Sequence, residues 1–180
     1  MERNIIFVGG IHGVGKTTFC NKLLENSNQN IVHQSCSNLL RLYKELEYNE
    51  NKNVKNVDEN QQILLEAIEK FMNDSEKYIL DGHFCLINSK NEITNVPIEV
   101  FEKTRPKLII ILKINAQIIC NRLKIRDKKD YSLDFIKKFQ EKEIKRARYI
   151  SENLNIKLKE IDLDLPYDID IDSFIWRLEK

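Results

Sequence analysis

Hydrophobic residues gather into short apolar runs separated by longer stretches with helical periodicity. The runs 4–8 and 108–112 are almost wholly apolar, which is typical of strands buried on both faces of a parallel sheet. Because runs and helical stretches alternate, the pattern predicts an α/β fold with right-handed crossovers. Strands are predicted at 4–8, 31–33, 78–80, 108–112 and 156–161, and helices at 16–26, 36–48, 58–73, 96–103, 115–124, 132–153 and 170–179.

Polar residues mark several boundaries of these elements. Asp58, Asn115 and Ser132 stand where helices begin, so each is a predicted N-cap. The polar segment 89–95 is a predicted loop. The polar segment 49–56 is either a surface loop or a cover over a substrate. No internal repeat is visible, so residues 1–180 are expected to form a single domain.

A glycine-rich motif stands between the first strand and the first helix. Residues 10–17 read Gly-Ile-His-Gly-Val-Gly-Lys-Thr, which fits the pattern Gly, four residues, Gly, Lys, Ser/Thr. Glycines let backbone N–H groups approach phosphate oxygens, and the following helix adds its unpaired N–H groups. Lys16 can reach terminal phosphates, and Thr17 offers a hydroxyl to Mg²⁺. The predicted ATP-binding residues are Gly10, His12, Gly13, Val14, Gly15, Lys16, Thr17 and Thr18.

A second candidate site follows the third strand, in the sequence Asp81-Gly82-His83. Ligands of open parallel sheets bind at the carboxyl ends of the strands, where Asp81 stands. Asp81 is expected to hold Mg²⁺ together with Thr17, and it could also orient an attacking hydroxyl. His83 either hydrogen-bonds an acceptor substrate or fills the edge of a pocket.

Arginines form a third candidate site. Arg122 and Arg126 are one helical turn apart, so a continuous helix places them on one face. Guanidinium groups stabilise the negative charge of a transferring phosphoryl group, and a mobile segment carrying them excludes water. Lys16, Asp81, Arg122 and Arg126 are therefore the predicted catalytic residues. Arg146 and Arg148 either face the same site or lie on a solvated helix face, and the sequence does not separate the two.

Polar residues after the second strand are candidates for binding a second substrate. Ser37 either contacts a phosphate or sugar or caps a helix. Gln61 and Gln62 either read the edge of a base through an amide or lie on an exposed helix face.

Composition removes several classes of function. Charged residues make up 32% and hydrophobic residues 42% of the chain, which is typical of a folded globular protein. The net charge of +1 argues against binding to bulk nucleic acid, although five lysines between 128 and 142 could form a stripe. No apolar run approaches the ~20 residues of a membrane span. Four dispersed cysteines predict free thiols and a cytoplasmic location, and three scattered histidines do not predict a zinc cluster.

The order of these motifs resembles the small nucleotide kinases of the phosphate-loop class, and looks closest to archaeal-type adenylate kinases and their bacterial relatives. The resemblance covers residues 4–162 and depends on the phosphate loop, on Asp58 and Gln62 opening a helix, and on Asp81-Gly82-His83. It implies a three-layer α/β/α P-loop NTPase fold with a five-stranded parallel sheet of order 2-3-1-4-5. It also implies a helical lid at about 122–135 and an acceptor-binding helical insertion at about 35–73.

The resemblance implies ATP, Mg²⁺ and a nucleotide acceptor. Ser37, Gln61, Gln62 and His83 are the candidate acceptor-binding residues. One departure concerns the acceptor, because Lys52 and Lys55 stand where the family has an arginine that grips its phosphate. Lysine lacks the bidentate fork of arginine. The leading hypothesis is ATP- and Mg²⁺-dependent phosphoryl transfer to a nucleotide or nucleoside-like acceptor. Its rivals are a P-loop ATPase and a nucleotide-binding module without a small-molecule acceptor. The sequence does not determine the oligomeric state.

Overall fold

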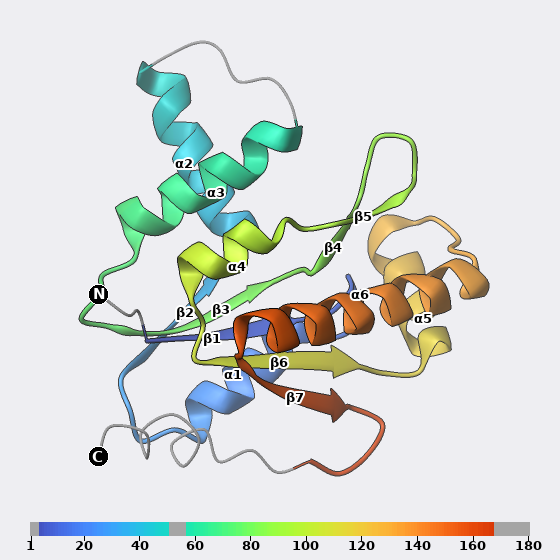
Figure 1. Ribbon diagram of the computed structural model, residues 1–180. Coiled ribbons are helices and arrows are strands. Elements are labelled where there is room, and N and C mark those ends of the chain that lie inside the picture. Colours follow the sequence, from blue (N-terminus) through green and yellow to red (C-terminus); the bar gives the residue numbers. More distant parts are fainter. Residues whose placement is uncertain (1–3, 51–56, 168–180) are drawn as a thin grey trace.

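The structure is a computed structural model that describes residues 4–50 and 57–167, without the side chains of 47–50 and 57–59. Its centre is a sheet of five parallel strands in the order β2-β3-β1-β6-β7. These strands are β1 (Asn4–Gly9), β2 (Ile31–Ser35), β3 (Lys77–Gly82), β6 (Leu108–Lys113) and β7 (Lys157–Asp162). Figure 1 shows the sheet between two layers of helices.

All five predicted sheet strands are present. Counted in chain order within this sheet, they stand in the predicted order 2-3-1-4-5. The numbering in the figures differs because β4 (Cys85–Ile87) and β5 (Ile93–Asn95) form a separate antiparallel hairpin. The loop predicted at 89–95 is therefore wrong at its end, where Ile93–Asn95 pair with β4. Short strands of this kind escape periodicity because three residues hold too little alternation.

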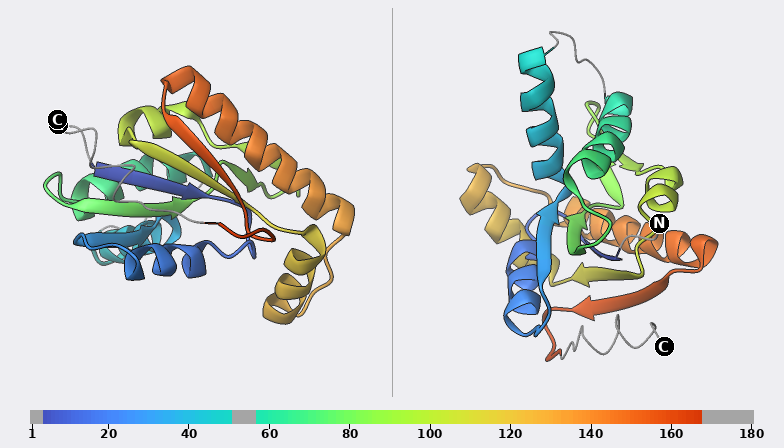
Figure 2. Two further views of the ribbon diagram at one scale, coloured as in Figure 1. Left: turned by 90° about the horizontal axis from the view of Figure 1, so that it is seen from below. Right: turned by 90° about the vertical axis from the view of Figure 1, so that its left-hand side faces the viewer.

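Helices cover both faces of the sheet, as Figure 2 shows. One face is covered by α1 (Lys16–Glu25) and α5 (Ala116–Asp127). The other is covered by α3 (Val57–Phe71), α4 (Ile98–Thr104) and α6 (Leu133–Leu154). Helix α2 (Cys36–Glu50) packs against α3, and the two project together from the sheet (Figure 1).

Alternation along the strands builds the two cores. Ile6 and Val8 of β1 belong to the core under α1 and α5, whereas Ile5 and Phe7 belong to the core under α3 and α4. Successive strand side chains point to opposite faces, so an apolar run such as 5–8 fills both cores. This explains why the central strands carry almost no polar side chains.

Two of the three predicted N-caps are confirmed. The side chain of Asn115 accepts a hydrogen bond from the Gln117 N–H at 2.8 Å, and that of Ser132 accepts one from the Phe135 N–H at 3.4 Å. The prediction for Asp58 is wrong, because α3 already begins at Val57. Helix α2 continues to Glu50, so the predicted polar loop 49–56 is helical at its start and otherwise lies outside the described residues. The predicted helix 170–179 also lies outside them.

The register of the strands brings the functional motifs to one edge. Asp81 pairs with Val8 of β1 on one side and with Ser35 of β2 on the other. The glycine-rich loop, the start of α2 and Asp81 therefore meet at the carboxyl end of the sheet. Across the described part of the chain, no helix combines the length and the apolar character needed to span a membrane.

Candidate active site

The glycine-rich loop joins β1 to α1 with a backbone that only glycine adopts easily. Gly13 has φ 81° and Gly15 has φ 113°, both in the left-handed region. A Cβ atom on Gly13 would lie 3.1 Å from the Leu123 side chain, so the loop also packs closely on α5. Substitution of either glycine would therefore strain the loop before any ligand entered it.

The start of α1 presents backbone donors. Gly15 precedes the helix and gives it no side-chain cap. In the described residues, the N–H groups of Lys16, Thr17 and Thr18 meet no acceptor. Unpaired N–H groups at a helix N-terminus form an anion-binding site. The loop is thus shaped to receive phosphate oxygens.

Lys16 lies beside this anion site, at the start of α1. Its ammonium donates to the Gly10 carbonyl at 2.7 Å and to the Ile11 carbonyl at 3.4 Å. Burial lowers the pKa of Lys16, while the carboxylates of Glu143 and Asp81 act in the opposite direction. Carbonyl oxygens carry only a partial negative charge, so the ammonium of Lys16 would bind a fully charged terminal phosphate more strongly.

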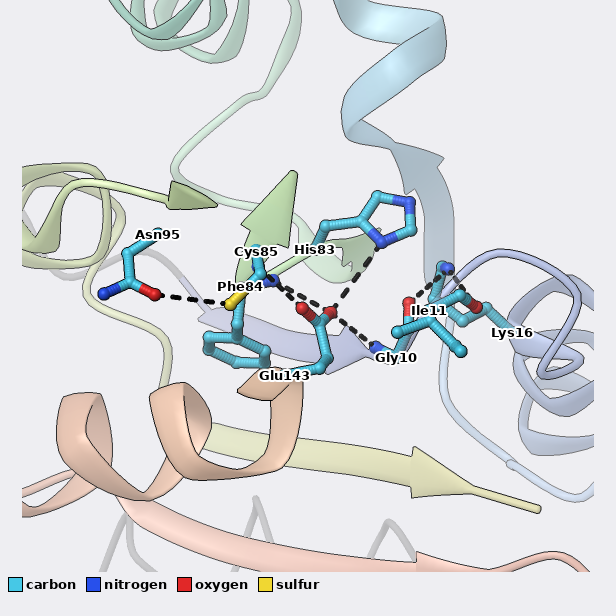
Figure 3. A network of polar contacts seen from close by, with 8 residues as sticks. All are labelled: Gly10, Ile11, Lys16, His83, Phe84, Cys85, Asn95 and Glu143. Carbon is cyan, nitrogen blue, oxygen red and sulfur yellow. Dashed lines mark hydrogen bonds and ion pairs between the residues drawn. The ribbon is translucent and has the colours of Figure 1, made fainter. Parts of the chain in front are cut away.

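Glu143 ties the loop to the rest of the site, as Figure 3 shows. Its carboxylate is 1% exposed and accepts hydrogen bonds from the N–H groups of Gly10 (3.2 Å), Phe84 (2.9 Å) and Cys85 (2.6 Å). Gly10, a predicted ATP-binding residue, donates its N–H to Glu143 and does not line the cavity. Glu143 holds the glycine-rich loop and the segment after β3 in a fixed relation.

Sequence reasoning gave Glu143 no role, although a signal was present. The buried positions of α6 are Ile136, Phe139, Glu143, Ala147 and Ile150. A carboxylate within an otherwise apolar stripe demands hydrogen-bond donors, because an unpaired buried charge is very costly. That pattern indicates a buried polar contact, but it does not name the partners 58 to 133 residues away.

Asp81 lies at the end of β3, is 7% exposed and lines the main cavity. Its Oδ2 atom accepts a hydrogen bond from His33 Nε2 at 2.7 Å. His33, Asp81 and the buried Cys20 each offer one ligand atom, and these atoms lie within 4.8 Å of one another. Burial raises the pKa of Cys20 to about 12, so its thiol stays protonated.

The donor types decide which metal suits this part of the site. Mg²⁺ takes oxygen ligands, whereas a thiol and an imidazole suit softer ions. The carboxylate of Asp81 and the hydroxyl of Thr17, which line the same cavity, fit Mg²⁺. Cys20 and His33 do not fit it.

His12 and His83 form a pair beside the loop. Their ring centroids lie 4.2 Å apart with an angle of 48° between the rings. Desolvation, with smaller effects from His83 and the Lys16 charge, lowers the pKa of His12 to about 3. His83 Nδ1 is buried, has no hydrogen-bond partner in the described residues and lies 3.7 Å from Glu143 Oε1. Both rings line the cavity, and the ring of His12 stays neutral at pH 7.

The arginines occupy different places. Arg122 donates to the carbonyls of Gly13 (3.0 Å) and Val14 (2.9 Å), and Arg126 pairs with Asp127 through two hydrogen bonds. Both line the cavity and both belong to α5, which runs to Asp127. The residues after α5 (128–132) lead directly into α6, so no separate helix forms within the predicted lid at 122–135.

Neither of the later arginines lines the cavity in the described structure. Arg146 donates twice to the Val96 carbonyl and stacks on Tyr149, with its guanidinium carbon 4.8 Å from the ring centroid. Arg148 pairs with Glu160 at an exposed position. Arg146 therefore holds Val96, a residue that lines the cavity, and Arg148 lies on the surface.

Some of the candidate acceptor-binding residues line the cavity and others do not. Ser37 and Gln61 line the cavity, but Gln62 does not and donates to Glu66 on an exposed face of α3. Ser37 is not the helix cap, because α2 begins at Cys36 and the Ser35 hydroxyl accepts the Asn38 N–H at 3.1 Å. Lys52 and Lys55 lie outside the described residues.

One cavity of about 840 Å³ joins these groups. It runs from the glycine-rich loop, α1 and α5 to a space between α2, α3, β4 and α4. Its lining includes all predicted ATP-binding residues except Gly10, together with Asp81, His83, Arg122 and Arg126. Residues far apart in the sequence therefore face a single volume.

A parallel sheet of order 2-3-1-4-5 with a glycine-rich loop between β1 and α1 defines the P-loop NTPase fold, the class to which kinases such as gluconokinase belong. Within that class, the AAA domain family matches residues 9–140, so the chain belongs to this family. A comparison with curated proteins finds no significant sequence match.

Solved structures share the fold at low sequence identity. A gluconokinase from Sinorhizobium meliloti 1021 superposes with a TM-score of 0.50 and 11% identity, covering 97% of this chain and 88% of its own. The tunicamycin resistance protein of Deinococcus radiodurans superposes with a TM-score of 0.53 and 11% identity, covering 87% of this chain and 98% of its own. The fold and the family match thus confirm the P-loop NTPase class, whereas kinase activity and the specific likeness to adenylate kinases stay predictions.

Proposed function

We propose that the protein is a kinase that transfers the terminal phosphoryl group of ATP, with Mg²⁺, to a small nucleotide or nucleoside-like acceptor. One observation carries this proposal: the cavity extends well beyond the phosphate-binding loop and continues between α2, α3 and α4. A hydrolase needs room only for water beside the terminal phosphate. A second compartment of this kind suits a second substrate.

The residues of the loop would divide the work of holding ATP. The N–H groups at the start of α1 would bind phosphate oxygens, and Lys16 would move from the Gly10 and Ile11 carbonyls to the terminal phosphates. Arg122 and Arg126 would stabilise the charge of the transferring group from α5. Thr17 and Asp81 would hold Mg²⁺, which neutralises charge on the phosphates when bound.

One half of the cavity would bind the acceptor and the other half would bind the phosphates of ATP, as predicted from the sequence. Residues 35–73, which include α2 and α3, would form the wall of the acceptor site. Residues 122–135 would cover the phosphates and exclude water, which prevents wasteful hydrolysis of ATP. Ser37, Gln61 and His83, which line the cavity, would contact the acceptor.

Product analysis with Mg²⁺-ATP tests the proposal against its rivals. A kinase yields ADP and a phosphorylated acceptor in equal amounts, and a hydrolase releases inorganic phosphate whatever acceptor is present. Tight nucleotide binding with negligible turnover would indicate a binding module instead.

Lys16→Ala is the matched variant for this test. We expect turnover to fall by roughly 10²–10³-fold or more, because one charged donor to the transition state is lost. Lys137→Ala is the control, since Lys137 is exposed on α6 and does not line the cavity. Normal turnover by the Lys16 variant, with its circular dichroism unchanged, would rule out the assignment of the loop.

A further inference from the structure

Among the described residues that line the cavity, positive charge lies on one side. In the described structure, the lysines and arginines that line it are Lys16 and Lys22 of α1 and Arg122 and Arg126 of α5. Helices α1 and α5 pack on the sheet face opposite α3 and α4. The cations therefore surround the phosphate-binding loop, where the donor nucleotide would lie.

The compartment between α2, α3 and α4 has a different character. Its described lining is mainly apolar, with Leu40 from α2, Leu64 from α3, Leu86 from β4 and Val100 from α4. None of the described residues in this part of the lining is a lysine or arginine. A phosphate monoester placed here would lose water without gaining a counter-ion, which strongly disfavours binding.

One polar group in this compartment points to an uncharged ligand. Gln61 lines the cavity, and its Oε1 atom is buried without a hydrogen-bond partner in the described residues. A buried amide oxygen without a partner is costly, so a ligand that brings an N–H or O–H donor is favoured there. Nucleobases carry such donors on an otherwise flat, apolar ring.

The boundary between the two compartments is acidic. Asp81 is the sole carboxylate among the described residues that line the cavity. Of its two oxygens, Oδ2 is hydrogen-bonded to His33, and no described residue hydrogen-bonds the other oxygen. A carboxylate oxygen accepts a hydrogen bond from a hydroxyl, so this free oxygen can orient the oxygen of an alcohol.

Resting on the proposed kinase function, we propose that the acceptor is an uncharged alcohol with an apolar or aromatic body, of which a nucleoside is the matching class. In the transfer, the acceptor hydroxyl oxygen forms a bond to the γ-phosphorus while the bond from that phosphorus to the β,γ-bridging oxygen breaks. The free oxygen of Asp81 accepts a hydrogen bond from the hydroxyl and orients it, the hydroxyl proton is released to water, and the products are ADP and a phosphate monoester. A nucleoside monophosphate or a sugar acid would meet no counter-ion among the described residues of this compartment.

Two titrations test this. In the first, the full chain is titrated with a non-hydrolysable ATP analogue and Mg²⁺, which tests the proposed function alone. In the second, the protein saturated with that analogue is titrated with adenosine and thymidine, then with their 5′-monophosphates and with gluconate. We expect each nucleoside to bind at least about tenfold tighter than its monophosphate, and gluconate not to bind.

The outcomes of the two titrations are separable. If the analogue does not bind, the proposed function fails. If the analogue binds but a monophosphate or gluconate binds as well as the nucleosides do, the assignment of a neutral acceptor is overturned. The same conclusion follows if neither nucleoside binds to the loaded protein.

A charge variant gives a second, independent measurement. Leu40 is half-buried and lines the acceptor compartment, so a lysine there can place its ammonium in the cavity. We expect Leu40→Lys to shift the nucleoside-to-monophosphate affinity ratio at least about tenfold toward the monophosphate, whereas the uncharged Leu40→Met leaves the ratio unchanged. An unchanged ratio in the lysine variant would contradict the proposal, because it would mean that charge does not select the acceptor.

Discussion

The two compartments of the cavity are built in opposite ways. The phosphate compartment is made mainly from one continuous segment, residues 12–18, with Arg122 and Arg126 added from α5. The acceptor compartment is made from side chains of α2, α3, β4 and α4, which are spread over more than sixty positions of the sequence. One compartment is polar and cationic, and the other is largely apolar.

This difference reflects what each compartment has to recognise. Every nucleoside triphosphate presents the same chain of oxygens, so a fixed ring of backbone donors serves all of them. An acceptor is recognised by its shape and by a few hydrogen bonds, which side chains provide and which can differ between proteins of one fold. Asp81 and Glu143 lie where the two compartments meet. Substitutions of these residues therefore test whether a change in one compartment affects the other.

Asp81→Asn should have the largest effect among these tests. Asparagine keeps the size of the side chain but loses the charge that would hold Mg²⁺ and orient the acceptor hydroxyl, so we expect kcat to fall by about 10²–10³-fold. Measured by steady-state kinetics with a nucleoside acceptor, KM for ATP should change little. Asp130→Asn is the control, since Asp130 is exposed and pairs only with Lys124 in the described structure. A rise in the Mg²⁺ requirement with unchanged kcat at saturating Mg²⁺ would show that Asp81 holds the metal but does not orient the acceptor.

Glu143→Gln should destabilise the protein by about 2–4 kcal/mol, because an amide cannot accept all three N–H groups that Glu143 holds and one would face another donor. Urea unfolding followed by circular dichroism measures this change. Glu141→Gln, on an exposed turn of the same helix, should stay within about 0.5 kcal/mol of the parent. Equal stability of the two variants would show that Glu143 does not hold the compartments together.

Arg122→Ala should act on the phosphate compartment alone. Its guanidinium holds the Gly13 and Val14 carbonyls and would stabilise the transferring phosphoryl group. One lost charge-assisted contact of roughly 1.5–3 kcal/mol corresponds to a fall of about tenfold or more in kcat/KM for ATP. The affinity for a nucleoside, measured on protein saturated with the ATP analogue, should not change. Arg148→Ala is the control, because Arg148 pairs with Glu160 away from the cavity. A parallel loss of nucleoside affinity would mean that the compartments are not separate.

His12→Asn should have the smallest effect and concerns pH. The pKa of His12 is about 3 in the folded protein and about 6.5 when unfolded, so the unfolded chain binds more protons between these values. Stability from this group is complete above about pH 6.5 and is lost as the pH falls toward 3. Urea unfolding at pH 7.5 and 5.5 should show a smaller loss for His12→Asn than for the parent. Because His12 is partly open to solvent, the difference will be modest, and identical losses would contradict the prediction.

The sequence by itself determined the fold class and the phosphate compartment. Apolar runs and helical periodicity gave the five sheet strands, and the motif at 10–17 gave the loop, because both depend on residues that are neighbours in the sequence. The order of the strands came from the resemblance to nucleotide kinases, and the structure has that order. The separate hairpin of β4 and β5 was missed because its strands are only three residues long.

Only the tertiary structure decided which polar side chains meet. It placed Gln61 in the cavity and Gln62 outside it, and joined His33 to Asp81 across two strands. It also turned Glu143 from one charge in a charged helix into the group that anchors the loop. The physical reason is that a hydrogen bond depends on positions within a few ångströms, and packing of the whole chain, rather than local periodicity, sets distances between residues far apart in sequence.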